Sequence, residues 1–99
     1  MIRIGVSALI FTATSTQFAL SSEAQRLVDL YGNLQTREWI TSVPGSARAE
    51  ISEALGSELS DRYVLNTCMR GMARDPEASN KPIRESIMNC IEWGKKNGW

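Results

Sequence analysis

Apolar residues recur along this chain at intervals of three and four positions, the spacing that places side chains on one face of an α-helix. The recurrence is interrupted by turn-forming residues, mostly Pro and Gly, which divide the chain into short helical pieces. The pattern predicts an all-α fold, a small domain of three to four helices that ends in a helical hairpin.

The first half of this domain has two apolar segments. The earlier one is short and interrupted by Gly32, and its apolar residues are Leu27, Val28, Leu30, Tyr31 and Leu34. After it, Thr36 is placed to cap one further turn that carries Trp39 and Ile40. A turn at residues 43–46 then leads to a clearer helix with Ser46 as its N-cap and its end near Gly56, and its apolar residues are Ala47, Ile51, Ala54 and Leu55.

The second half predicts a helical hairpin. One helix is expected to start at Ser60-Asp61, because a hydroxyl and an acidic group both favour a helix N-terminus. Its inward residues are Val64, Leu65, Cys68 and Met72. A loop between Arg74 and Pro82 follows, and Pro82 suits the first turn of the last helix. That helix is expected to end near Gly94, with Ile83, Ile87, Cys90 and Ile91 facing inward.

The chain has two cysteines, Cys68 and Cys90, and each lies on the inward face of one hairpin helix. At a rise of about 1.5 Å per residue, the two positions fall within about one helical turn of each other across an antiparallel pair. A domain of this size usually needs a covalent link to supplement its core. We therefore predict a Cys68–Cys90 disulfide.

The N-terminus has the features of a secretory signal peptide. Arg3 provides the basic n-region, and the apolar run from Ile4 to Ala13 has the length of an h-region. We prefer cleavage after Ser22-Glu23-Ala24, which gives a signal peptide at 1–24 and one domain at 25–99; Ala19-Leu20-Ser21 is a second site. A retained membrane anchor or a cytosolic helix is less favoured, because Ser, Thr and Gln dilute the apolar residues. The expected location is periplasmic or secreted, where disulfides form.

Charge and side-chain chemistry favour a function other than catalysis. Eleven basic residues balance eleven acidic ones, so the composition does not indicate a nucleic-acid partner. The chain has no histidine, the commonest general base and metal ligand. Acidic residues at 50, 53, 58 and 61 are best interpreted as a solvated helix face, and the serines lack a base. We expect a protein that is not an enzyme and needs no cofactor.

Soft ligands are concentrated in the predicted hairpin, where Met69, Met72 and Met88 accompany the two cysteines. Thioether and thiolate groups favour Cu(I), so a copper or small-ligand carrier is the alternative function. The simpler interpretation is that Met72 fills the core while Met69 and Met88 lie at its edge.

Three tryptophans are a large aromatic share for a short chain. Trp39 and Trp93 are expected to pack against the domain, whereas Trp99 follows Lys95 and Lys96 at the C-terminus. Aromatic residues outside a core are typical of contact surfaces. We list Trp39, Trp99, Lys95 and Lys96 as partner-binding candidates. The alternatives for Trp99 are a ring folded back on the domain or a disordered end.

In its layout of signal, helices and cysteine pair, the chain resembles small exported helical proteins of Gram-negative bacteria, including acid-stress chaperones and periplasmic immunity proteins. The resemblance has no shared motif, so it transfers no site residue. Together with the residues above, it predicts a non-enzymatic protein-interaction module, chaperone-like or inhibitor-like, with a protein partner in the cell envelope and no stable membrane span after cleavage.

Overall fold

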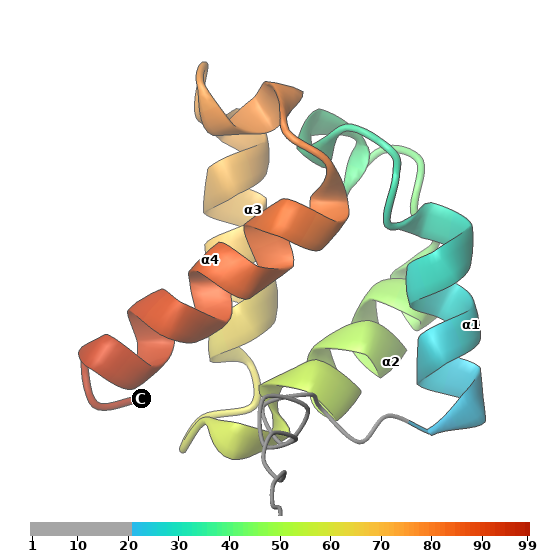
Figure 1. The fold of residues 1–99 in the computed structure, drawn as a ribbon. Coiled ribbons are helices and arrows are strands. Elements are labelled where there is room, and N and C mark those ends of the chain that lie inside the picture. Colours follow the sequence, from blue (N-terminus) through green and yellow to red (C-terminus); the bar gives the residue numbers. More distant parts are fainter. Residues whose placement is uncertain (1–20) are drawn as a thin grey trace, which may run out of the picture.

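The computed structural model describes residues 21–99, and Figure 1 shows their arrangement. Within this part of the chain lie four α-helices: α1 (Ser22–Tyr31), α2 (Gly45–Leu55), α3 (Val64–Arg74) and α4 (Ile83–Lys96). Short 3-10 helices occur between them: η2 (Thr36–Glu38), η3 (Gly56–Glu58) and η4 (Ala78–Asn80). The predicted all-α fold and its C-terminal hairpin are confirmed for these residues.

The helices pack as two pairs around a common core. Helix α1 lies beside α2, and α3 lies beside α4, while η2 packs against α3 and η4 (Figure 1). The n-region and apolar run of the predicted signal peptide lie outside the described residues. Among residues 21–99, no helix is both long and apolar enough to span a membrane.

The core is built around Trp39, the largest side chain that is fully buried. All four helices and the residue after η3, Leu59, contribute apolar side chains to the cluster that includes it, among them Leu27, Ile51, Leu65, Ile83 and Ile91. Met69 is fully buried as well, and Met72 only partly, which reverses the roles expected for these two methionines. The buried face of α3 is therefore centred closer to Met69 than its apolar pattern indicated.

Two helix starts differ from the predicted ones. Helix α2 begins at Gly45 with Pro44 at the N-cap, two positions before the expected cap. Helix α3 begins at Val64, because the Asp61 carboxylate accepts a hydrogen bond from the Tyr63 backbone N–H at 2.8 Å and forms a separate turn. The acidic residue predicted at this helix start thus shapes the turn that precedes it.

Helix α4 continues past Gly94 to Lys96. Gly94 serves a packing purpose instead of ending the helix: a Cβ at this position would lie 3.0 Å from Cδ2 of the buried Leu59. The missing side chain lets the segment after α2 approach α4 closely.

The first turn of α4 is completed by a distant part of the chain. The backbone N–H groups of Ile83 and Arg84 donate to the carbonyl oxygens of Leu34 and Gly32, at 2.8 and 2.9 Å. These bonds satisfy helix donors that side chains usually cap, and no side-chain cap is present here. The loop after α1 therefore sets the position of α4.

A buried hydroxyl pair strengthens the same junction. Thr36 Oγ1 donates to the Lys81 carbonyl oxygen at 2.6 Å, and it lies 2.7 Å from Ser86 Oγ. Both hydroxyl-bearing residues are fully buried. Thr36 thus joins η2 to α4, a role different from the N-cap role predicted for it.

The predicted disulfide is present. Cys68 of α3 and Cys90 of α4 are bonded, with their Cα atoms 5.9 Å apart. Cys90 is fully buried and Cys68 is partly exposed, so one edge of the bridge reaches the surface. The cross-link holds the two helices of the hairpin together at mid-length.

Candidate functional site

Three aromatic side chains are exposed around one surface groove of the hairpin. Tyr63, Trp93 and Trp99 have exposed fractions of 67%, 48% and 46%. They border a depression of about 390 Å³, whose floor includes Val64, Thr67 and the exposed edge of Cys68. Exposed aromatic rings gathered at a concave surface are typical of binding sites.

A second depression, of about 360 Å³, continues the first along the seam between α3 and α4. It shares Cys68 and Trp93 with the first and adds Gly71, Met72 and Asn89. We call the two together the aromatic groove. Its walls come from both hairpin helices, and the disulfide lies between them.

Helical spacing explains why Trp93 is only half buried. Cys90 faces fully inward on α4, and Trp93 follows it by three positions, which places its ring at the border of the buried face. Trp93 was expected to pack into the domain, and the structure instead leaves about half of its surface open to solvent.

The backbone at the C-terminus folds back on the domain. Gly98 has a positive φ of 80°, and the Trp99 N–H donates to the Gly94 carbonyl oxygen at 2.8 Å. The Trp99 carbonyl oxygen in turn accepts from the Ser60 N–H at 2.8 Å. The backbone is thereby held, while the indole lines the aromatic groove.

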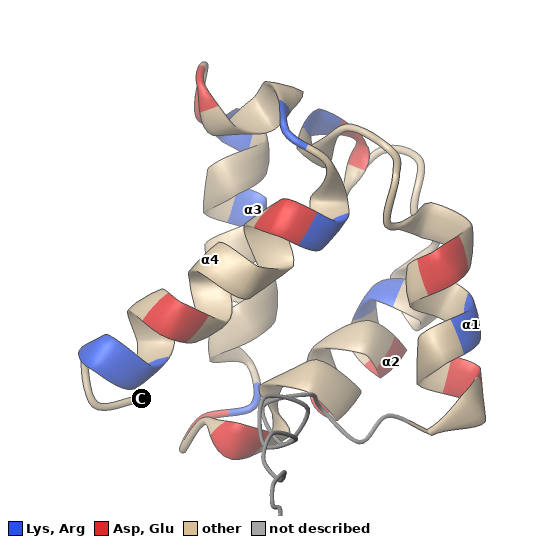
Figure 2. Cartoon of the chain, in the orientation of Figure 1, with Lys and Arg blue, Asp and Glu red and all other residues tan. Residues whose placement is uncertain are grey.

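The two lysines before Trp99 lie on the surface of α4 and do not line the groove. Lys95 forms an ion pair with Glu58 of η3, and Lys96 is exposed. Figure 2 shows basic and acidic residues distributed over the helices, and the charged residues that line the groove itself are Asp61 and Asp75.

Trp39 is not a surface contact residue. It is fully buried, and its indole Nε1 donates to Asn66 Oδ1 at 3.0 Å. The expectation that Trp39 packs is confirmed, but its candidacy as a partner-binding residue is wrong, because no part of the ring reaches the surface.

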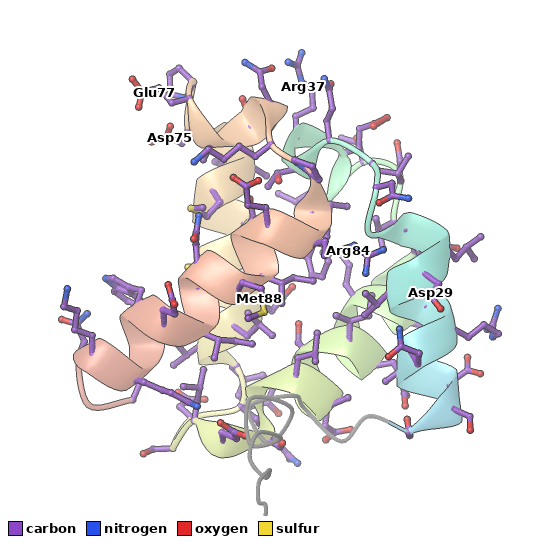
Figure 3. All side chains as sticks on the ribbon, viewed as in Figure 1. Asp29, Arg37, Asp75, Glu77, Arg84 and Met88 are labelled. Atoms are coloured by element: carbon purple, nitrogen blue, oxygen red, sulfur yellow. A yellow bond between two sulfur atoms is a disulfide. The ribbon has the colours of Figure 1, made fainter. Side chains whose placement is uncertain are left out.

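The methionines of the carrier hypothesis lie in different environments. Met69 is enclosed in the core, Met72 lines the groove, and Met88 is 46% exposed on α4 (Figure 3). Both cysteine sulfurs are in the disulfide and so offer no thiolate. Within residues 21–99, no cluster of three or more His, Cys, Asp or Glu could hold a metal ion. The copper hypothesis stays untested and gains no support from this arrangement.

The acidic residues considered for catalysis lie on the surface. Glu53 forms an ion pair with Arg62 at 3.0 Å, Glu58 pairs with Lys95, and Asp61 caps the turn before α3. Each of these three carboxylates has a structural partner, and Glu50 is exposed on α2, as expected of a solvated face.

Sequence reasoning missed Tyr63 altogether and assigned Trp93 to the core. Tyr63 follows Asp61 and Arg62 and lies outside the apolar stripe of α3. A large aromatic residue outside an apolar stripe indicates an exposed ring, and this pattern could have identified Tyr63 as a surface residue.

No family description matches the chain, and comparisons with curated proteins and with solved structures give no significant match. The function of this chain is therefore inferred from its own geometry and chemistry.

Proposed function

We propose that the chain is an exported, non-enzymatic protein-interaction module that binds a protein partner of the cell envelope in the aromatic groove. The observation that carries this proposal is the gathering of Tyr63, Trp93 and Trp99, all substantially exposed, around one apolar depression. Rings of this kind dominate the binding energy of many protein interfaces.

The disulfide supports a binding role because it fixes the groove in advance. Cys68 lies in the groove between the two helices that form the walls, and Cys90 ties it to α4. A surface that is already ordered loses less conformational entropy when a partner binds. The groove is thus suited to a defined partner segment, which favours an inhibitor-like role over a chaperone that accepts many chains.

The lining indicates the chemistry of the partner. Val64, Met72 and the two indoles present apolar surface, and the polar groups of the lining are Thr67, Asn89 and the carboxylates of Asp61 and Asp75. Apolar side chains of a partner segment would fill the groove, and its backbone would find hydrogen-bonding groups at the polar positions.

The disulfide and the signal-like N-terminus together support an exported location. Export remains part of the proposal, and fractionation of cells that make the full chain would test it.

Site-specific photo-crosslinking tests the groove directly. A crosslinking residue at Thr67 in the groove should trap one discrete protein in envelope fractions, and the same residue at Leu30 on α1 should not. Leu30 is a suitable control because it is apolar and 57% exposed, but distant in sequence and not a groove residue. A ladder of many adducts from Thr67 would favour the chaperone-like role.

The trapped partner then allows an affinity test. Trp93→Ala and Trp99→Ala should each weaken binding by roughly thirtyfold, the effect of losing an aromatic anchor of about 2 kcal/mol. Leu30→Ala should leave the affinity unchanged. If both tryptophan variants bind like the parent protein and remain folded, the groove is not the binding surface.

A further inference from the structure

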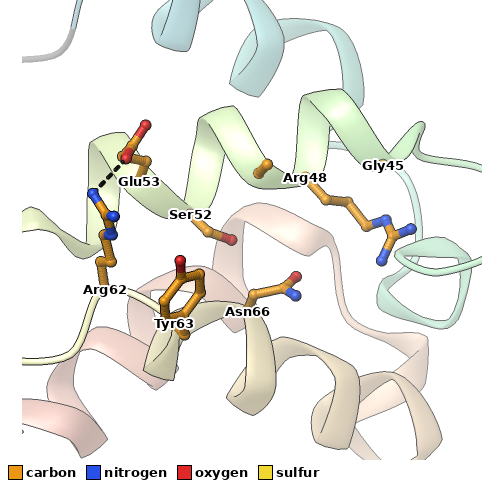
Figure 4. A pocket seen from close by; sticks show the side chains of 8 residues that line it. Gly45, Arg48, Ser52, Glu53, Arg62, Tyr63 and Asn66 are labelled. Carbon is orange, nitrogen blue, oxygen red and sulfur yellow. Dashed lines mark hydrogen bonds and ion pairs between the residues drawn. The ribbon is translucent and has the colours of Figure 1, made fainter.

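A pocket of about 320 Å³ that contains several polar side chains lies between α2 and the start of α3, next to the aromatic groove (Figure 4). Arg48 and Ser52 line it from α2, and Arg62, Tyr63 and Asn66 line it from the opposite side. Figure 4 shows Ser52, Tyr63 and Asn66 turned into the same space. Most of these groups donate hydrogen bonds.

Ser52 contributes a buried hydroxyl to this pocket. Its side chain is buried, with an exposed fraction of only 4%, and its Oγ has no hydrogen-bond partner among the described residues. Helical serines often bond to the carbonyl four positions earlier, but Ser52 has no such bond. Buried hydroxyls without a partner are rare, so this one calls for an explanation.

The orientation of Asn66 is determined by Trp39. An indole N–H can only donate, so the Asn66 oxygen must face it, and the observed bond from Trp39 Nε1 to Oδ1 has this geometry. The Nδ2 group therefore points the other way. It supplies two N–H donors to the pocket that no protein group accepts in residues 21–99.

Arg48 adds a positive charge without an acidic partner in the described chain. Its Nε donates to the Val43 carbonyl oxygen at 3.2 Å, which anchors the side chain over the N-terminal end of α2. Its terminal nitrogens remain available at the pocket wall. Arg62 differs, because Glu53 already neutralises it and it stacks 5.6 Å from the centre of the Tyr63 ring.

We propose that this pocket binds a carboxylate group of the same protein partner, an inference that rests on the proposed function. A hydroxyl, an amide NH₂ group and a guanidinium converge on the pocket, and a carboxylate provides the lone pairs that they need. A singly charged anion matches the one unneutralised arginine. A phosphate dianion is less suitable, because the Glu53 carboxylate lies in the same pocket.

Tyr63 connects the pocket to the aromatic groove, because it lines both. One partner segment can therefore place apolar side chains against Trp93 and Trp99 and a carboxylate beside Arg48 and Ser52. A free small acid has the same chemistry, and the experiment must distinguish the two sources.

Acetate is the probe for the pocket itself. In an NMR titration of the oxidised protein at constant ionic strength, the chemical shift of the Asn66 side-chain amide should change with acetate and reach saturation at millimolar acetate concentrations. Acetamide, which has the same shape without the charge, and chloride should not produce this shift. Equal shifts from acetate, acetamide and chloride would overturn the proposal.

Variants locate the binding groups. Arg48→Gln and Ser52→Ala should each weaken acetate binding, by roughly tenfold for the arginine. Asn66→Asp retains the acceptor for Trp39 but places a negative charge in the pocket, so it should abolish acetate binding in a folded protein. Arg26→Gln on α1 and Asn33→Asp in the loop after α1 make the same charge changes elsewhere and should bind acetate normally.

The crosslinked partner separates this inference from the proposed function. Arg48→Gln should reduce partner affinity by roughly tenfold. A partner whose acidic residue is changed to the corresponding amide should bind Arg48→Gln and the parent protein with equal affinity. If the tryptophan variants lose the partner and Arg48→Gln does not, the groove hypothesis stands and the partner-carboxylate inference fails. Acetate binding combined with unchanged partner affinity would assign the pocket to a free acid and overturn the inference.

Discussion

The indole Nε1 of Trp39 donates a hydrogen bond to Oδ1 of Asn66 over 3.0 Å. The bond joins the largest fully buried ring of the core to a side chain that lines a surface pocket. It therefore satisfies a buried donor and, at the same time, turns the Asn66 amide nitrogens toward the pocket.

Removing the Asn66 acceptor should destabilise the fold. Asn66→Leu leaves the Trp39 N–H buried without a partner, and we expect a loss of about 1 to 3 kcal/mol in the free energy of unfolding. Asn66→Asp keeps an acceptor and should lose much less at neutral pH. Urea unfolding followed by Trp fluorescence measures both, and equal losses would show that the indole bond does not matter.

Breaking the disulfide should have the same effect by either route. Cys68→Ser, Cys90→Ser and reduction of the parent protein all remove one cross-link, and each should lower stability by about 2 to 5 kcal/mol. Thermal melts with and without reductant give the comparison. Variants that melt together with the oxidised parent would contradict a stabilising role for the bridge.

Two glycines should respond to alanine in opposite ways. At Gly32, the cap of α1, a Cβ would overlap the Val28 carbonyl oxygen, so Gly32→Ala should cost about 1 to 3 kcal/mol. Gly71 lies inside α3 with open space around it, so Gly71→Ala should add about 0.5 to 1 kcal/mol. Chemical denaturation of the two variants, side by side, tests the packing at each site.

Asp75 should make stability depend on pH. Backbone N–H groups of Ala78 and Glu77 donate to its carboxylate, near the end of α3 (Figure 3), and they hold its pKa below the usual value. The depressed pKa stabilises the folded state above the unfolded pKa of about 4, and this contribution is lost as the pH falls through the folded pKa.

Asp75→Asn provides the reference for that effect, because the amide oxygen can still accept but does not titrate. The difference in melting temperature between parent and variant should be constant near neutral pH and change as the medium is acidified. A difference that stays constant down to about pH 2.5 would show that Asp75 contributes no pH dependence.

The start of the mature chain has a structural consequence. Ala24 is fully buried, and its N–H donates to Ser21 Oγ at 3.1 Å, so cleavage before Gln25 would remove the first turn of α1. We expect a protein starting at Gln25 to melt below one starting at Ser21. N-terminal sequencing of the exported chain tests the predicted start at Gln25, and a start at Ser22 would indicate the second cleavage site.

The hairpin and its disulfide were predictable because they depend on local spacing. Cys68 and Cys90 each lie at helical spacing from the apolar residues of their own helix, and two prolines mark the intervening loop. The roles of Met69 and Trp93 were not predictable in this way, because the rotation of each helix depends on the neighbours against which it packs. The spacing of apolar residues along the sequence does not indicate where η2 or the C-terminal residues pack.

The candidate sites were predictable only in part. Trp99 was identified because it lies beyond any apolar stripe, and it does line the groove. The pocket at Ser52 joins residues from separate helices and depends on a missing hydrogen bond, which no sequence pattern reveals. The complete burial of Trp39 was also not predictable, because its contact with Asn66 of α3 depends on the tertiary fold.

The carbonyl groups of Gly32 and Leu34 complete the first turn of α4, although about fifty positions of chain separate them from it. The C-terminal hairpin is therefore not a transferable unit, despite its internal cross-link. Excised or fused to another protein, it would begin with open amide groups and a frayed end. Substitutions in the loop after α1 should therefore also disturb the start of α4, which is distant in sequence but hydrogen-bonded to that loop.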